Sequence, residues 1–143
     1  EVAVDSSFSG YDASPLNDGV TVGEGLHWTK EAWASADKAQ AHFIELRFPE
    51  PRSIARALVY WSLDAGVART SREITIEVPE GEGWKRVAIV RPPAPEAVTE
   101  IRFPQAIRSD RFRFLQPVGA GPQGRPNLMW VREIELFPEP AAR

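Results

Sequence analysis

The sequence contains no cysteine. It therefore has no disulfide framework, no thiolate nucleophile and no zinc site built on cysteine ligands. Histidine is scarce as well, because His27 and His42 are the two in the chain and their spacing is not that of a zinc motif. The lack of cysteine does not identify the compartment, since many secreted domains have no disulfides.

The chain also lacks long apolar runs and an excess of positive charge. No apolar run approaches the ~20 residues that a membrane-spanning helix needs, so we expect no membrane insertion. The formal net charge is −3, which argues against binding to nucleic acid. The first residues, EVAVDSSFSG, are typical of a strand and not of a signal peptide.

Catalytic motifs are missing too. The sequence has no Gly-x-Ser-x-Gly elbow, no phosphate-binding loop and no dinucleotide fingerprint. Carboxylate pairs such as Glu73 and Glu77, or Glu133 and Glu135, occupy alternate positions of predicted strands, where solubilising charges belong. We therefore predict that the chain is not an enzyme. A small β-sandwich enzyme stays as the weakest alternative, and it would need a cleft with two convergent titratable groups.

What the sequence does contain is apolar residues that alternate with polar ones. HFIELRF, SREITIEV, TEIRF and RFRFL each show this period of two, which predicts strands with one buried and one solvated face. SIARALVYW is more continuously apolar, as expected of a central strand. With WKRVAIV and EVAVDSSF this makes about eight short strands, which predicts an all-β antiparallel sandwich.

A length of 143 residues suits one domain with a substantial core. We assign residues 1–138 to a single domain and residues 139–143 to a tail or linker, because Pro138 and Pro140 end the last strand. We expect the isolated domain to be monomeric.

Three predicted connections are long for a compact β domain: about 10–41, 62–71 and 117–129. Long loops on a rigid sandwich are often functional. Four of the five tryptophans lie in or beside these loops, and the exception is Trp84. Trp33 and Trp84 are interpreted as core or core-edge residues, whereas Trp61 fits the core and a loop mouth equally well.

These loops hold the residue types that a sugar site needs. A sugar requires an aromatic platform for its apolar face and planar or charged groups for its hydroxyls. The predicted ligand-binding residues are His27, Trp28, Trp61, Asp64, Arg69, Arg125, Asn127 and Trp130. Trp130 shares strand parity with Ile134 and Leu136, so it could cap the core, form a platform, or do both.

The order of features along the chain resembles a known family. The segments VDSSFSGYDASPLNDGV, WASAD, HFIELRFPEPRSIARALVYW, SREITIEV with GWKRVA, and SDRFRFLQP with VREIELF are similar to those of a discoidin domain. This is the coagulation-factor C-type, galactose-binding-like, jelly-roll β-sandwich, and the absence of cysteine fits its bacterial members best. Among these, the chain most resembles the family 32 carbohydrate-binding modules.

The resemblance implies a function and a location. It implies a non-catalytic module that binds glycans through loops at one end of the sandwich, attached to other domains of a glycan-active bacterial parent protein. The implied location is extracellular, periplasmic or at the cell surface. The alternative is a protein-interaction or spacer domain of the same fold, with a wide, flat apolar patch or no patch.

The resemblance also implies a structural Ca²⁺ between the first long loop and the last strand. The matching side-chain ligands are Asp18, in the Asp-Gly turn, and Glu133, which opens the last strand. Calcium takes six or more oxygens, so carbonyls around residues 17–21 would complete the set. The alternative is that Asp18 bonds its own turn, while Glu133 either faces water or accepts hydrogen bonds from the same loop.

Overall fold

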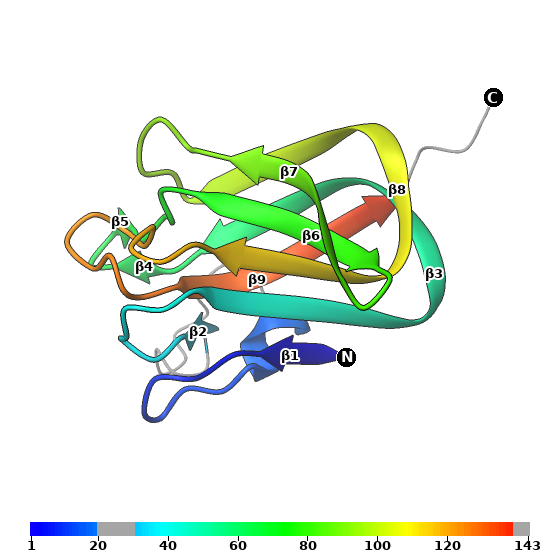
Figure 1. Ribbon diagram of the computed structural model, residues 1–143. Coiled ribbons are helices and arrows are strands. Elements are labelled where there is room, and N and C mark those ends of the chain that lie inside the picture. The colour runs from blue at the N-terminus through cyan, green and yellow to red at the C-terminus, as the bar shows by residue number, and fades with distance from the viewer. Residues whose placement is uncertain (20–30, 139–143) are drawn as a thin grey trace.

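The computed structural model describes residues 1–19 and 31–138, almost entirely as antiparallel strands (Figure 1). The expected all-β sandwich is confirmed. No helix in this part of the chain is long and apolar enough to cross a membrane. The elements are β1 (Val2–Val4), the 3₁₀ helix η1 (Ser14–Asn17), β2 (Trp33–Ala34), β3 (His42–Trp61), β4 (Leu63–Asp64), β5 (Val67–Ala68), β6 (Ile74–Glu80), β7 (Gly83–Val90), β8 (Val98–Gln116) and β9 (Trp130–Pro138).

Two long strands connect the layers of the sandwich. The main sheet has the order β2-β9-β3-β8-β6-β7, and β1 pairs with β3. The first half of β3 pairs with β1 and with the end of β8, whereas its second half pairs with β9 and with the start of β8. One layer is therefore β1, β3, β8, β6 and β7, and the other is β2, β9, β3 and β8. Both long strands bend at the same end of the molecule (Figure 1).

The bends explain why the sequence pattern reads as separate short strands. In β3, Pro49 and Pro51 interrupt the alternation, and the pairing with β8 shifts register between Arg47 and Arg52. Proline cannot donate to the ladder, and a bulge increases the local bend of a strand. The chain thus continues as one strand while it passes from one layer to the other.

The core lies between the layers and is built by the predicted alternation. Ile44 on β3, Ile76 on β6, and Phe112 and Phe114 on β8 are all fully buried. Trp33 is also fully buried, and its indole N–H donates to the carbonyl of Ser6 and to the hydroxyl of Ser7. The assignment of Trp33 to the core is therefore confirmed. Trp84 is half-buried and belongs to no core cluster; the guanidinium of Arg113 lies 4.1 Å from its ring centre.

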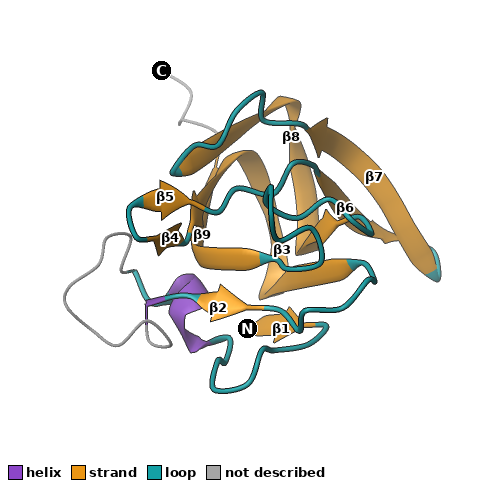
Figure 2. Ribbon diagram, turned by 90° about the vertical axis from the view of Figure 1, so that its left-hand side faces the viewer, coloured by secondary structure: helices purple, strands orange, loops and turns teal. Residues whose placement is uncertain are grey.

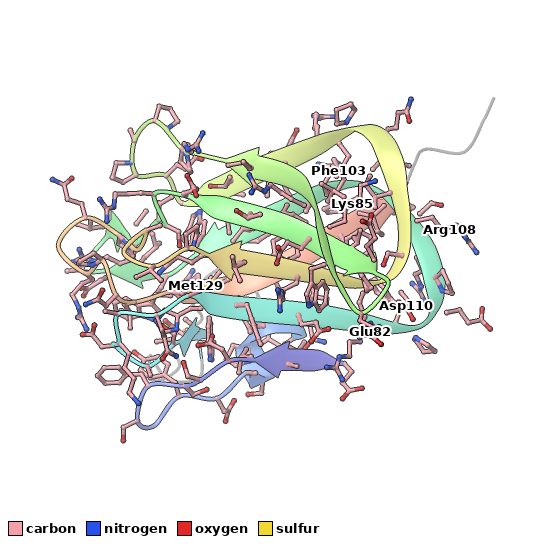
Figure 3. All side chains as sticks on the ribbon, viewed as in Figure 1. Glu82, Lys85, Phe103, Arg108, Asp110 and Met129 are labelled. Carbon is pink, nitrogen blue, oxygen red and sulfur yellow. The ribbon has the colours of Figure 1, made fainter. Side chains whose placement is uncertain are left out.

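Loops gather at the end of the molecule opposite the bends (Figure 2). The β4–β5 hairpin turns at Ala65 and Gly66, whose φ angles of 51° and 80° give a turn of positive φ that suits glycine. The loop 117–129 lies at the same end of the molecule (Figure 1). It ends at Met129, which is fully buried at the start of β9 and is labelled in Figure 3.

His42 holds the loop 117–129 in place. Its ring is fully buried, Nε2 donates to the carbonyl of Asn127 at 2.8 Å, and Nδ1 lies 2.8 Å from a carboxylate oxygen of Asp5. Gln116 adds a bond from its side-chain amide to the carbonyl of Leu128. The loop is therefore fixed to the sandwich by buried polar contacts, which are costly to break.

Gly121 is packed too tightly to carry a side chain. A Cβ atom there would lie 2.6 Å from the carbonyl oxygen of Arg125 and still closer to that of Leu128. We expect Gly121→Ala to lower the free energy of unfolding by about 1–3 kcal/mol, because the loop must open to admit the methyl group. Chemical denaturation measures this, with Gly83→Ala as the control, since a Cβ at Gly83 meets its nearest atom at 3.8 Å. Equal stability of the two variants would contradict the prediction.

Candidate functional site

A cavity of about 440 Å³ opens at the loop end of the sandwich. A second cavity of about 80 Å³ adjoins it and shares Tyr11 and Trp130 as walls. The larger cavity is lined by Tyr11, Glu31, Ser62, Leu63, Asp64, Ala65 and Trp130. The smaller one is lined by Phe8, Tyr11, Ala34, Arg125, Leu128 and Trp130. Segments from the connection between β1 and β2 (the first loop), the β4–β5 hairpin, the loop 117–129 and β9 therefore meet in one place.

Trp130 forms a wall between the two cavities. A register shift between β3 and β9 falls at Trp61 and Val131, so the alternation changes there and Val131 enters the core. Trp130 instead packs with Tyr11, Ala34 and Leu128 in a small separate cluster and stays partly exposed. Its side chain is both packed and open to the cavities, as the third interpretation from the sequence allowed.

Tyr11 supplies the second aromatic wall. Its ring meets that of Trp130 edge to face, with centroids 6.3 Å apart and planes at 89°. The pKa of Tyr11 is raised to about 12, chiefly by burial and then by the carboxylate of Asp64, while the guanidinium of Arg125 acts to lower it. The phenol is therefore protonated at neutral pH and faces groups of both charges, as in a site that recognises hydroxyls.

The polar residues predicted from the loops divide into two groups. Asp64 lines the larger cavity, and Arg69, which directly follows β5, donates to its carboxylate at 2.9 Å. Arg125 lines the smaller cavity and pairs with Asp37 at 3.2 Å. Asn127 lines neither cavity, and its carbonyl accepts the bond from His42. The structure thus brings Trp130, Asp64 and Arg125 together, with Arg69 as a supporting residue.

Trp61 is a correction to the predicted ligand set. Its side chain has no exposed surface, and its indole N–H donates to the hydroxyl of Thr99 at 2.8 Å. A ring enclosed on both faces cannot stack on a ligand, so Trp61 is a core residue. His27 and Trp28 lie outside the described residues.

Phe8 and Tyr11 are site residues that the sequence analysis missed. They stand in the polar, glycine-containing stretch SSFSGYD, and their rings meet edge to face at 6.1 Å. An aromatic residue among Ser, Gly and Asp is the same signal that singled out Trp130. Applied to the first loop, it would have found both residues.

Glu133 lies buried next to the first loop at a second place on the sandwich. The 3₁₀ helix η1 packs against β9, and Glu133 is 1% exposed. The pKa of Glu133 is raised to about 7, chiefly by burial and then by the carboxylate of Asp18. The backbone amides of Gly19 and Asp18 act as donors that lower this pKa, although neither contact has the geometry of a full hydrogen bond.

This geometry contradicts a Glu133 that faces water, because its side chain is buried, and it leaves two ways to stabilise the carboxylate. A cation could neutralise both carboxylates, and the amides of Gly19 and Asp18 are the donors that the loop offers in its place. Residues 1–19 and 31–138 contain no cluster of three or more His, Asp or Glu that could hold a metal. Backbone carbonyls would therefore have to supply most of the oxygens beside Asp18 and Glu133.

The larger cavity contains two carboxylates, and both are ion-paired. Asp64 pairs with Arg69, and Glu31 lies 3.5 Å from the guanidinium of Arg132. Ionised carboxylates accept hydrogen bonds from the hydroxyl groups of a ligand. Together with two aromatic walls, this arrangement is suited to holding a polar molecule that has an apolar face.

Comparison with known proteins identifies the fold. No protein-family profile and no curated relative matches the sequence. Solved structures match over nearly its whole length. The CBM32-1 and CBM32-2 domains of Clostridium perfringens ZmpB, in complex with GalNAc, align with a TM-score of 0.76 at 14% identity over 97% of this chain and 33% of that one. The chain thus spans about a third of that structure.

Two single modules align over most of their own length. The family 32 module of C. perfringens NanJ, in complex with galactose, gives a TM-score of 0.72 at 13% identity, over 95% of this chain and 91% of that one. Chitosan-binding module 1 of a Paenibacillus sp. IK-5 chitosanase/glucanase gives 0.68 at 18% identity, over 96% and 93%. The chain therefore has the discoidin-like fold of the family 32 carbohydrate-binding modules.

Proposed function

We propose that this chain is a non-catalytic carbohydrate-binding module that holds a glycan in the cavity at its loop end. The observation that carries the proposal is the position of Trp130 and Tyr11, which wall one cavity of about 440 Å³ with polar groups around them. Structures of the same fold bind GalNAc, galactose and chitosan. The function proposed here matches both the fold and the chemistry of the cavity.

The residues divide the work as sugar recognition requires. The partly exposed ring of Trp130 offers an apolar face to the C–H groups of a pyranose. Asp64 accepts hydrogen bonds from sugar hydroxyls, and Arg125 donates to them from the adjoining cavity. Phe8 and Leu63 are 38% and 43% exposed at the rim and extend the apolar surface for a longer glycan.

Replacement of Trp130 tests the proposal. A glycan array followed by titration calorimetry identifies the ligand, with galactose, GalNAc and chitosan oligosaccharides as the first probes. We expect Trp130→Ala to weaken binding at least tenfold, because loss of a central aromatic contact costs about 2 kcal/mol or more. Trp84→Ala is the matched control, since Trp84 is also half-buried but stacks on Arg113 away from the cavity.

Three results would overturn the proposal. One is the absence of binding to any glycan at millimolar concentration by a folded sample. Another is equal binding by Trp130→Ala and the native chain. The third is an equal loss of affinity in Trp84→Ala, which would place the glycan on the outer face of β7.

Calcium completes the proposal. We propose that Asp18 and Glu133, with backbone carbonyls of the first loop, hold a structural Ca²⁺. Two observations support this: the buried carboxylate of Glu133, whose oxygens make no full hydrogen bond, and the effect of Asp18 on its pKa. When bound, the ion neutralises both carboxylates and joins the first loop, which carries Phe8 and Tyr11, to β9.

The module is proposed to belong to a larger bacterial protein that acts on glycans outside the cytoplasm. A domain of this kind raises the local concentration of its parent protein at a glycan surface, and several modules in one chain multiply that effect. Sequencing the flanking regions of the gene and locating the parent protein in cell fractions test this context.

A protein partner is the second candidate function. Leu63 and Val67, on the two strands of the β4–β5 hairpin, are 43% and 50% exposed, and Val118 in the neighbouring loop is 63% exposed. Apolar side chains of this size on protruding loops also suit a flat protein surface. Retained partner binding in Trp130→Ala together with loss in Val67→Ser would favour this function over sugar binding.

A further inference from the structure

The end of the sandwich opposite the proposed glycan site contains a larger cavity, of about 580 Å³. It lies where β3 and β8 bend from one layer to the other (Figure 1). Leu46 and Phe48 line it from one layer, and Ile54, Ile134 and Leu136 line it from the other. The cavity is therefore a place where the apolar space between the layers opens to the surface.

The opening is a seam between two strand edges. In both layers, β8 pairs with one edge of β3. The other edge of β3 pairs with β1 in one layer and with β9 in the other. Within the described residues, the outer edge of β1 pairs with no strand, and β9 pairs on its outer edge only at Trp130 and Val131. From Ile134 to Pro138, β9 thus pairs with no described strand on its outer side and lies beside an apolar cavity, as in proteins that bind an extended peptide. The 3₁₀ helix η1 also packs on β9, and its residue Asn17 lines the cavity.

The rim of the seam is positively charged. Arg47, Arg52 and Arg108 line the cavity, against one carboxylate side chain, that of Glu1. Arg47 pairs with Glu45, whereas Arg52 and Arg108 form no ion pair with the described residues. Arg52 lies 5.1 Å from the ring centre of Phe48, and both Arg52 and Arg108 are exposed. Figure 3 shows Arg108 at the bend of β8.

We propose that this seam binds an extended peptide segment in which acidic and aliphatic residues alternate. The aliphatic side chains enter the cavity between Leu46 and Leu136, the peptide backbone pairs with the outer edge of β9, and the acidic side chains meet Arg52 and Arg108. Alternation is the pattern that places neighbouring side chains on opposite sides of an added strand. The charge of the rim selects acidic over basic peptides.

The test uses a seven-residue peptide of alternating Glu and Leu, capped at both ends and titrated into ¹⁵N-labelled protein. Saturable shifts of the amides of Leu46, Ser53, Ile54, Ile134 and Leu136 are expected. We expect Arg52→Glu/Arg108→Glu to weaken binding at least tenfold. Arg86→Glu, an exposed change on β7 that does not line the cavity, leaves it unaltered. Raising the salt concentration also weakens binding.

Several outcomes would overturn the proposal. One is the absence of amide shifts at the seam at 2 mM peptide. Another is equal binding of a control peptide in which Lys replaces each Glu. The third is unchanged binding by the Arg52→Glu/Arg108→Glu variant, in a sample whose spectrum shows that it is folded. Decanoate that saturates the same amides more tightly than the peptide would make the occupant an acyl chain. If the protein forms a dimer that the Arg52→Glu/Arg108→Glu variant dissociates, the occupant of the seam is a second copy of the chain. The glycan titration is independent, because that site lies at the other end.

Discussion

Calcium added to the metal-free protein is expected to raise its free energy of unfolding by about 2.7 kcal/mol once the ion exceeds its Kd a hundredfold. The physical reason is that the ion binds the folded state, where Asp18 and Glu133 are held together, and not the unfolded chain. Thermal unfolding with calcium or with EDTA measures the effect as a shift of several degrees in Tm.

The same site predicts how stability depends on pH without calcium. The pKa of Glu133 is raised from 4.5 to about 7 in the folded protein, so the folded state binds the proton more tightly than the unfolded state. The contribution to stability is complete below about pH 4.5 and is lost as pH rises through 7. The loss is on the order of 3 kcal/mol for a shift of this size.

Glu133→Gln tests directly whether the carboxylate charge of Glu133 binds the ion. The amide keeps the shape of the protonated carboxyl, so the variant should be more stable than the native chain at pH 8 in EDTA and should not respond to calcium. Asp18→Asn should also lose the calcium response. The exposed Glu82→Gln is the control and should behave like the native chain. A melting curve of the native protein that ignores calcium and EDTA, from a sample that contains no metal by elemental analysis, would contradict the prediction.

Trp61→Ala is expected to lower the free energy of unfolding by about 3–5 kcal/mol, which is close to the whole stability of many domains. The side chain is fully buried among core residues, and the change leaves both a cavity and the hydroxyl of Thr99 without its indole donor. Urea denaturation measures the loss.

Trp61→Phe provides the matched functional test. It keeps much of the apolar volume and removes the indole N–H, so a smaller loss of stability is expected than in Trp61→Ala. Its glycan affinity should equal that of the native chain, because Trp61 does not line the loop-end cavities. If Trp61→Phe bound the glycan more weakly while its free energy of unfolding was unchanged, Trp61 would belong to the ligand site.

Part of the site was predictable because it depends on local composition. Trp130, Asp64 and Arg125 were found as aromatic and polar residues in long loops, and they line the two adjoining cavities. Tyr11 and Phe8 carry the same local signal and were overlooked. Arg69 and Asn127 also lie in these loops, but they bind Asp64 and His42. Composition identifies a loop of this kind and does not say which way each side chain turns.

By itself, the sequence determined the all-β class and the buried face of most strands, because alternation along a strand depends only on neighbouring residues. It also predicted that the first loop meets the last strand, through the resemblance, and the packing of η1 on β9 agrees with this. Only the tertiary structure decided that β3 and β8 each cross both layers, that Trp61 is enclosed, and that Trp130 turns out of the core while Val131 enters it. Register shifts depend on partners far away in the chain, so a single extra residue reverses every local prediction of which side chain faces inward.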